Sequence, residues 1–250
     1  MKRLQAVGIS HRGKVRSNNE DRYLIDDDEA IAIYAVADGM GGHAAGEVAS
    51  SMALEVVHNF SADRRQEFLM AADNRQTVRP LLEEMLAQAN AEVLNAGTTN
   101  PDYAGMGTTL TMLMVIAGQS WLAHIGDSRA YLLREDDLLP LTDDHTLVSQ
   151  LVRTGQISAE EQDGHPQRNI LTRALGTDEV AVFDLLPLTL LQNDGLLLCS
   201  DGLYGLVSNA EIKHIMTQDN APLEKIQELV ALANEKGGTD NITAVLIYNI

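Results

Sequence analysis

The sequence has little cysteine and no long hydrophobic segment, and each shortage excludes a class of protein. Cys199 is the only cysteine, so no disulfide can form within the chain and a disulfide-stapled scaffold is excluded. The longest apolar stretches, such as TTLTMLMVIA at 108–117, are far shorter than the roughly 20 residues of a membrane-spanning helix. The N-terminal MKRLQAVGIS lacks the apolar centre of a signal peptide. We therefore expect a cytoplasmic protein without a membrane partner.

Positive charge is also scarce. Lysine and arginine total 18 against 36 aspartate and glutamate residues, which gives a formal net charge of −18. Nucleic acid and anionic membranes would be repelled at long range, so neither is expected as the main partner. A basic or metal-bridged partner fits this charge better, although many of the acids could serve solubility alone.

The 250 residues contain no Pro-rich or Ser/Gly-rich linker and no internal repeat, so we expect one domain over 1–250. Turn signals at Gly118 and Gly126 divide the apolar segment 112–133 and predict an antiparallel meander. Strand patterns grouped as hairpins, with helical patterns in separate blocks, indicate an α+β fold with two antiparallel sheets covered by helices. Strands are expected at 4–10, 22–26, 30–37, 108–117, 120–125, 129–134, 180–186, 195–200 and 242–249, and helices at 44–60, 78–95 and 222–235.

Acidic residues recur where apolar strands end. Asp38 follows AIYAVA, Asp127 follows WLAHIG, Asp201 follows GLLLCS, and Asp240 precedes ITAVLIY. The segment NNED adds Glu20 and Asp21. A single Asp-Gly after a strand is most often a turn former, but so many in one context favour a shared site.

Converging carboxylates repel one another, so a shared site would need a cation between them. Because the candidates are oxygen ligands with no zinc-type Cys/His spacing, the cation should be Mg²⁺ or Mn²⁺, with Ca²⁺ less favoured.

Arg16 and His43 could complete a phosphate site around these acids. A guanidinium binds a phosphoryl group through two hydrogen bonds, and an imidazole can donate a proton near neutral pH. Each also has a plainer interpretation, Arg16 as a surface charge and His43 as a helix-start residue. The glycines of DGMGGH at 38–43 could form a backbone cradle for phosphate or a bend that aims Asp38; we favour the bend.

A series of short motifs runs through the chain in the order RSNNED (16–21), DGMGGH (38–43), GTT (107–109), GDSR (126–129), DDH (143–145), HPQRNILTRALG (165–176), SDGL (200–203) and GGTDNIT (237–243). Together they resemble the motif series of the metal-dependent PP2C-type (PPM) serine/threonine protein phosphatases in their compact bacterial form.

This resemblance implies a central β-sandwich of two antiparallel sheets flanked by pairs of helices, with two Mn²⁺ or Mg²⁺ ions at one end. Asp38 would bridge both ions, the Gly39 carbonyl would bind the first, and Asp201 and Asp240 would hold the second. Glu20 and Asp21 would act through metal-bound waters, and Asp127 matches a third, weaker metal position.

Chemistry follows from this arrangement. Two nearby cations lower the pKa of a bridging water, and the resulting hydroxide attacks phosphorus in line. Arg16 would orient the phosphoryl oxygens, and His43 would protonate the departing serine or threonine oxygen. The family also implies phosphoprotein substrates, an opposing bacterial Ser/Thr kinase, a monomer, and a flap at about 145–170.

Two other enzyme classes do not fit the residues. A cysteine phosphatase needs arginine six residues after its cysteine, where this chain has Gly205. A P-loop enzyme needs Lys and Ser/Thr after its glycines, and DGMGGHAAGE lacks them. A catalytically silent phosphatase-like binding module remains the alternative, although the full set of site residues speaks against it.

Overall fold

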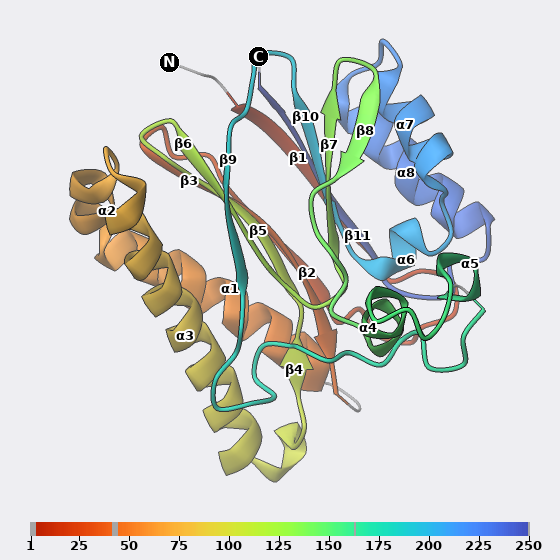
Figure 1. Cartoon of the computed structure of the whole chain (residues 1–250), viewed down its shortest axis with the longest axis horizontal. Helices are drawn as coiled ribbons and strands as arrows, with labels where there is room; N and C mark the ends of the chain where they lie inside the picture. Colours follow the sequence, from red (N-terminus) through yellow and green to blue (C-terminus); the bar gives the residue numbers. More distant parts are fainter. Residues whose placement is uncertain (1–3, 42–44, 163, 250) are drawn as a thin grey trace.

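The computed structural model describes residues 4–41, 45–162 and 164–249. Its strands form two antiparallel sheets that stack face to face, as Figure 1 shows. One has the order β1-β11-β10-β7-β8, and the other has the order β2-β3-β5-β6-β9, with β4 paired to β3. The strands are β1 (Leu4–His11), β2 (Asp21–Asp26), β3 (Ile31–Met40), β4 (Gly107–Thr108), β5 (Leu110–Ile116), β6 (Gln119–Ile125), β7 (Arg129–Arg134), β8 (Asp137–Pro140), β9 (Asp184–Leu188), β10 (Gly195–Cys199) and β11 (Ile242–Asn249).

Helices cover the outer face of each sheet (Figure 1). The sheet that contains β3 is covered by α1 (Ala45–Asp63), α2 (Arg65–Ala71) and α3 (Arg75–Thr99). The sheet that contains β11 is covered by α6 (Asp201–Tyr204), α7 (Asn209–Thr217) and α8 (Pro222–Glu235). Two further short helices, α4 (Leu147–Arg153) and α5 (Ala159–Gln162), lie in the segment between β8 and β9. The expected α+β sandwich flanked by helices is confirmed.

The central strands are apolar on both faces because both faces are covered. Along β3, Ile33 and Ala35 pack under the helices, while Tyr34 and Val36 point into the layer between the sheets. The same alternation places Cys199 of β10 in the core beneath α7 and α8, where it is fully buried. A strand buried on two sides loses the polar alternation of a surface strand, which explains the nearly continuous apolar runs in the sequence.

The expected meander at 112–133 is correct for its first turn and wrong for its second. Strand β6 pairs with β5 in register, for example Leu113 with Leu122, but β7 pairs with β8 and β10 in the other sheet. The chain crosses between sheets at Gly126, whose φ of 106° favours glycine. A hairpin turn and a crossover between stacked sheets use the same turn residues, so the sequence pattern could not separate them.

Element boundaries differ from expectation in a few places. The second predicted helix begins earlier, at Arg75, because the side chain of Asn74 accepts a hydrogen bond from the backbone N–H of Gln76 and caps it. Pro80 therefore lies inside α3 and not at its start. The strand expected at 180–186 forms at Asp184–Leu188. The short β8, α2 and α4–α7 had no expected counterpart, because each is too short to show a clear periodicity.

Within the described residues, none of the helices combines the length and the apolar character that crossing a bilayer requires.

Candidate functional site

The predicted acids come from separate elements that end at the same edge of the sandwich. Asp21 opens β2 and lies directly opposite Asp38 of β3 in the antiparallel register. Asp127 lies in the crossover between β6 and β7, Asp201 is the first residue of α6 after β10, and Asp240 lies two residues before β11. The topology thus brings together residues that are up to 220 positions apart in the sequence, Glu20 and Asp240.

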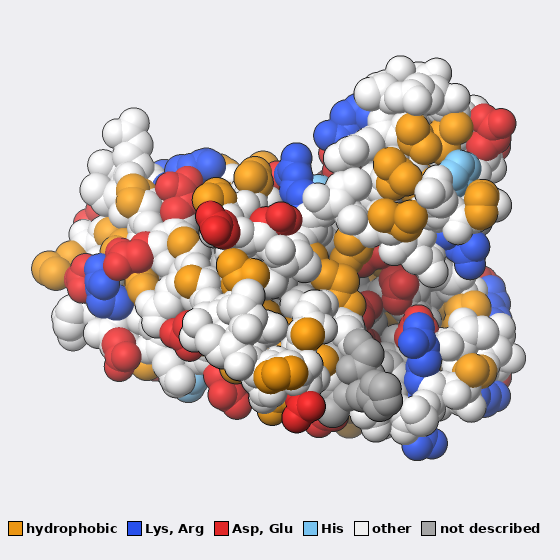
Figure 2. All heavy atoms as spheres, turned by 90° about the horizontal axis from the view of Figure 1, so that it is seen from below, with side chains coloured by type: hydrophobic (Ala, Val, Ile, Leu, Met, Phe, Trp, Pro, Cys, Tyr) orange, Lys and Arg blue, Asp and Glu red, His pale blue; other side chains and the backbone are white. Residues whose placement is uncertain are grey.

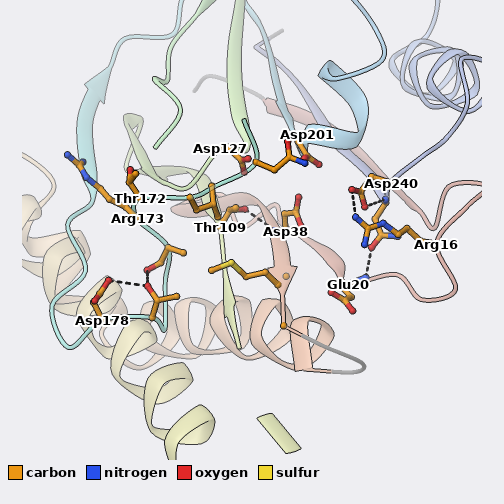
Figure 3. A pocket seen from close by; sticks show the side chains of 18 residues that line it. Arg16, Glu20, Asp38, Thr109, Asp127, Thr172, Arg173, Asp178, Asp201 and Asp240 are labelled. Atoms are coloured by element: carbon orange, nitrogen blue, oxygen red, sulfur yellow. Dashed lines mark hydrogen bonds and ion pairs between the residues drawn. The ribbon is translucent and has the colours of Figure 1, made fainter. Parts of the chain in front are cut away.

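These elements surround a hollow of about 710 Å³. Figure 2 shows a recess on this face of the molecule with acidic side chains inside it. In the close view of Figure 3, Asp38, Asp127 and Asp201 face one another, and Asp240 lies beside Arg16 and Glu20. Of the expected site residues, those that line the hollow are Arg16, Glu20, Asp38, Gly39, Asp127, Asp201 and Asp240.

Burial, and then mutual repulsion, raises the pKa values of these acids. Burial raises the pKa of Asp38 well above its ordinary value, and the nearby charges of Asp21 and Asp201 raise it further. Burial, with Asp201, raises the pKa of Asp127 to about 8. Burial, with Asp240, raises the pKa of Asp201 to about 6. Such shifts mean that these carboxylates, without a counter-charge among them, hold protons that a cation would displace.

Asp21 supports this interpretation most directly. Only 1% of its surface is exposed, and burial raises its pKa to about 7. One carboxylate oxygen accepts a hydrogen bond from the Ser200 hydroxyl at 2.7 Å, while Oδ1 is buried without a partner among the described atoms. A buried carboxylate oxygen without a donor suits a site that offers it a cation or a metal-bound water.

The acids surround the hollow without closing on one point. In the part of the chain that the structure describes, no three acidic, histidine or cysteine side chains come close enough to enclose a metal ion by themselves. Arg16 occupies part of the space, since its guanidinium donates to Asp240 at 2.6 Å. The donor set is oxygen alone, which fits Mg²⁺ or Mn²⁺ and not zinc.

Asp38 is fixed through its own backbone. Its N–H donates to the Thr109 hydroxyl at 2.9 Å, and its carbonyl accepts from the Thr108 hydroxyl at 2.9 Å. The N–H of Gly39 donates to the carbonyl of Glu20 at 3.2 Å. These two N–H groups are therefore not available to a phosphate. The Asp38 carboxylate lines the hollow, which supports the bend, while Gly42 lies outside the described residues.

Gly39 has to be glycine for a packing reason. A Cβ atom there would lie 2.0 Å from the carbonyl oxygen of Gly46 and 2.7 Å from that of Glu20. Only a residue without a side chain lets β3, the start of α1 and the Glu20 backbone meet this closely. The same contact keeps Glu20 beside the hollow.

His43 lies outside the described residues, so the structure does not test its position. The bend before it is described: Gly41 has a φ of 140°, a conformation that residues with a side chain rarely adopt.

Sequence reasoning missed Asn241, which holds the loop bearing Arg16 and Glu20. Its side-chain amide donates to the carbonyls of Arg12 at 3.0 Å and Asn18 at 2.8 Å. Its side-chain oxygen accepts from the N–H of Glu20 at 2.8 Å. Its position next to Asp240 in GGTDN was the only available signal.

Tyr204 and Arg129 were also missed as supports of the site. The Tyr204 hydroxyl donates to the carbonyl of Asp127 at 2.8 Å. The Arg129 guanidinium lies 3.7 Å from the centre of the Tyr204 ring and makes a two-pronged ion pair with Asp144 at 2.8 and 2.9 Å. This stack fixes the crossover that carries Asp127. It also links the GDSR and DDH motifs, because Arg129 belongs to the first and Asp144 to the second.

The sequence profile of the family described as Protein phosphatase 2C matches residues 7–246. This chain belongs to the protein phosphatase 2C family. The chain resembles the serine/threonine phosphatase stp of Listeria innocua, with 39% identity over 245 residues that cover 98% of this chain and 95% of that protein. It is also 39% identical over 238 residues to the protein phosphatase PhpP of Streptococcus pneumoniae, covering 94% of this chain and 93% of that protein.

Solved structures agree with this family over the whole chain. A serine/threonine phosphatase of S. agalactiae superimposes with a TM-score of 0.91 at 34% identity, covering 99% of this phosphatase 2C chain and 100% of that chain. The catalytic domain of the serine threonine protein phosphatase PstP, solved with two manganese ions, gives a TM-score of 0.83 at 35% identity, covering 100% of both chains.

Proposed function

We propose that this phosphatase 2C protein hydrolyses phosphoserine and phosphothreonine in proteins, with two Mn²⁺ or Mg²⁺ ions held in the acid-lined hollow. The observation that carries the proposal is the convergence of Asp38, Asp127 and Asp201 on one hollow, where burial and mutual repulsion raise their pKa values. The names of the relatives and the manganese ions of the PstP structure support the same function.

We assign the cation ligands from these positions. Asp38 would bridge the two ions, the Gly39 carbonyl would bind the first, and Asp201 and Asp240 would bind the second. Glu20 and Asp21 would hold metal-bound waters, and Asp127 would serve a third, weaker ion. When bound, such ions supply Lewis acidity and lower the pKa of a water, so that a nucleophile exists at neutral pH.

Arg16 would orient the phosphoryl group. Its side chain is 54% exposed at the edge of the hollow, so it can turn from Asp240 toward an incoming phosphate. The hydrogen bond to Asp240 and the charges of nearby acids raise its pKa, so the guanidinium stays charged and can offset developing charge on the phosphoryl oxygens. His43 would donate the proton that the departing serine or threonine oxygen needs.

The wider setting is proposed on the same basis. The chain would act as one catalytic domain, residues 1–250, with a flap at about 145–170 that includes α4 and α5. We further propose that it is a cytoplasmic monomer that opposes a bacterial Ser/Thr kinase. Asn169, at the end of the flap, lines the hollow, which supports substrate contact there.

The test is hydrolysis of a phosphothreonine peptide by the purified chain in Mn²⁺. Turnover should stop with EDTA and return when Mn²⁺ is added in excess. Asp38→Asn should lower kcat/KM by more than about 100-fold, because it removes the ligand proposed to bridge both ions. Asp136→Asn is the matched control, since Asp136 is an exposed turn residue far from the acids in the fold.

Undiminished turnover in metal-free buffer would refute the two-metal assignment. Absence of turnover in every divalent metal, together with measurable binding of the phosphopeptide, would favour the silent binding module instead.

A further inference from the structure

The hollow extends beyond the acids assigned to metal, and its far wall carries one more carboxylate. Asp178 lines the same hollow but lies apart from the acid cluster, on the side opposite Arg16 and Asp240 (Figure 3). Asp178 is not among the main charges that shift the pKa of Asp38, Asp127 or Asp201. Its position in the hollow makes it a separate negative charge, apart from the acids assigned to metal.

The backbone around Asp178 is held by a buried amide. Asn90 of α3 is only 2% exposed, and its side chain donates to the carbonyl of Asp178 at 2.9 Å and accepts from the N–H of Gly176 at 2.7 Å. The Thr177 hydroxyl donates to the Asp178 carboxylate at 3.2 Å. The segment is thus fixed in place while the carboxylate itself stays exposed to the hollow.

No basic side chain neutralises this carboxylate within the part of the chain that the structure describes. Arg173 also lines the hollow, but its guanidinium contacts Asp184 at 3.4 Å and His145 at 3.3 Å. Figure 3 shows it directed away from the acid cluster. The Asp178 carboxylate is therefore open to a basic group that enters the hollow. The net charge of −18, which two divalent ions would offset only in part, adds a long-range attraction for basic segments.

We propose that Asp178 pairs with a lysine or arginine that flanks the phosphorylated residue, so that the preferred substrates are phosphoserine and phosphothreonine sites with a basic neighbour. This inference rests on the proposed phosphatase function. The preference is one-sided along the substrate. A segment that places its phosphate at the acids and Arg16 extends toward Asp178 with only one of its two flanks, so the other flank does not meet this carboxylate.

The test uses a series of phosphothreonine peptides with an otherwise neutral sequence. Each peptide carries one lysine, alanine or glutamate at a single position, and the positions run from three residues before the phosphothreonine to three residues after it. For the unaltered phosphatase, lysine should raise kcat/KM about two- to fivefold over alanine on one flank only, in line with an exposed ion pair. Glutamate at the same place should lower kcat/KM by a similar factor. The lysine preference should shrink in high salt.

For each variant, the measured quantity is the ratio of kcat/KM for the lysine peptide to kcat/KM for the glutamate peptide. A change that affects both peptides equally leaves this ratio unchanged. Asp178→Asn should bring the ratio at the responsive position close to one, and Asp178→Lys should invert it. Asp136→Asn, which alters an equally exposed acid away from the hollow, should keep the ratio of the unaltered protein. Both Asp178 variants alter an exposed side chain, and equal thermal midpoints verify that they fold.

An unchanged lysine-to-glutamate ratio in both Asp178 variants would overturn the inference, as would a preference of equal size on both flanks. Failure of the proposed function looks different. In that case neither peptides nor a small aryl phosphate would be hydrolysed with Mn²⁺. Hydrolysis of the aryl phosphate without charge discrimination among peptides would refute the Asp178 assignment alone.

Discussion

Asp38 shows how a single residue serves both fold and site. Its backbone completes the hydrogen bonding between β3 and the Thr108–Thr109 pair, and its side chain enters the hollow. The same local order, strand and then Asp-Gly, is common in plain turns. The backbone N–H groups of Asp38 and Gly39 are occupied, which favours the bend over a phosphate cradle built from these two groups.

The proton donor proposed for the leaving oxygen gives the prediction at this scale. His43→Ala should lower kcat strongly on phosphoserine or phosphothreonine peptides, whose alkoxide leaving groups need protonation, by roughly 10²–10⁴-fold. An aryl phosphate has a much better leaving group and should be affected far less. Steady-state rates on both substrates measure the difference. Equal losses on both would argue that His43 acts in binding or folding and not as a general acid.

At the next scale, the loop between β1 and β2 matters most. It has no regular structure of its own between His11 and Asp21, yet it carries Arg16 and Glu20. Asn241, 6% exposed directly before β11, makes the three hydrogen bonds to this loop described above. It acts together with backbone contacts such as those of Lys14 and Val15 with the carbonyl of Gly238, since a loop cannot satisfy its backbone groups alone.

Asn241→Ala should therefore reduce both stability and activity. Removing a buried side chain with these bonds should lower the free energy of unfolding by about 1–3 kcal/mol, as measured by thermal or urea unfolding. If the amide acts through Arg16, the loss in kcat/KM from Asn241→Ala combined with Arg16→Ala should be smaller than the sum of the two single losses. Asn220→Ala, in the exposed loop between α7 and α8, is the control. Additive losses would separate Asn241 from Arg16.

For the whole molecule, the gathered acids link stability to pH and metal. In the unfolded chain, aspartate ionises near its ordinary pKa of about 3.9. In the metal-free folded chain, burial raises the pKa of Asp21 to about 7 and that of Asp127 to about 8. The folded state then binds more protons than the unfolded state across this window. The free energy of unfolding therefore falls as pH rises through it.

In EDTA, the thermal midpoint should decrease as the pH is raised from about 6.5 to about 8.5. The free energy of unfolding should decrease by up to about 1.4 kcal/mol per pH unit for each carboxyl that is still protonated in the folded state. This range avoids the opposite contribution of His124, whose pKa burial lowers to about 4 and whose effect lies at lower pH. Added Mn²⁺ should raise the midpoint most at the alkaline end, since it binds the ionised carboxylates. A midpoint that is flat with pH in EDTA would contradict the assigned shifts.

Many features of this protein could be predicted from the sequence. The apolar periodicity predicted most strands and the long helices, since strands covered on both faces leave continuous apolar runs. The acids after strands predicted the oxygen-lined hollow. The crossover at Gly126 and the short helices could not be predicted, because a turn signal does not say which sheet the chain enters next and short helices have no clear period.

The sequence by itself determined which groups could hold hard cations, because the oxygen ligands, the lone cysteine and the ordered motifs are properties of composition and order. Only the tertiary structure decided which of those groups meet. Asp38 and Asp201 share a hollow because two stacked sheets end at one edge. Asp178 lines the far wall of this hollow, where the side chain of Asn90 holds its backbone carbonyl. Distances between residues far apart in the chain depend on long-range packing, and no local pattern encodes them.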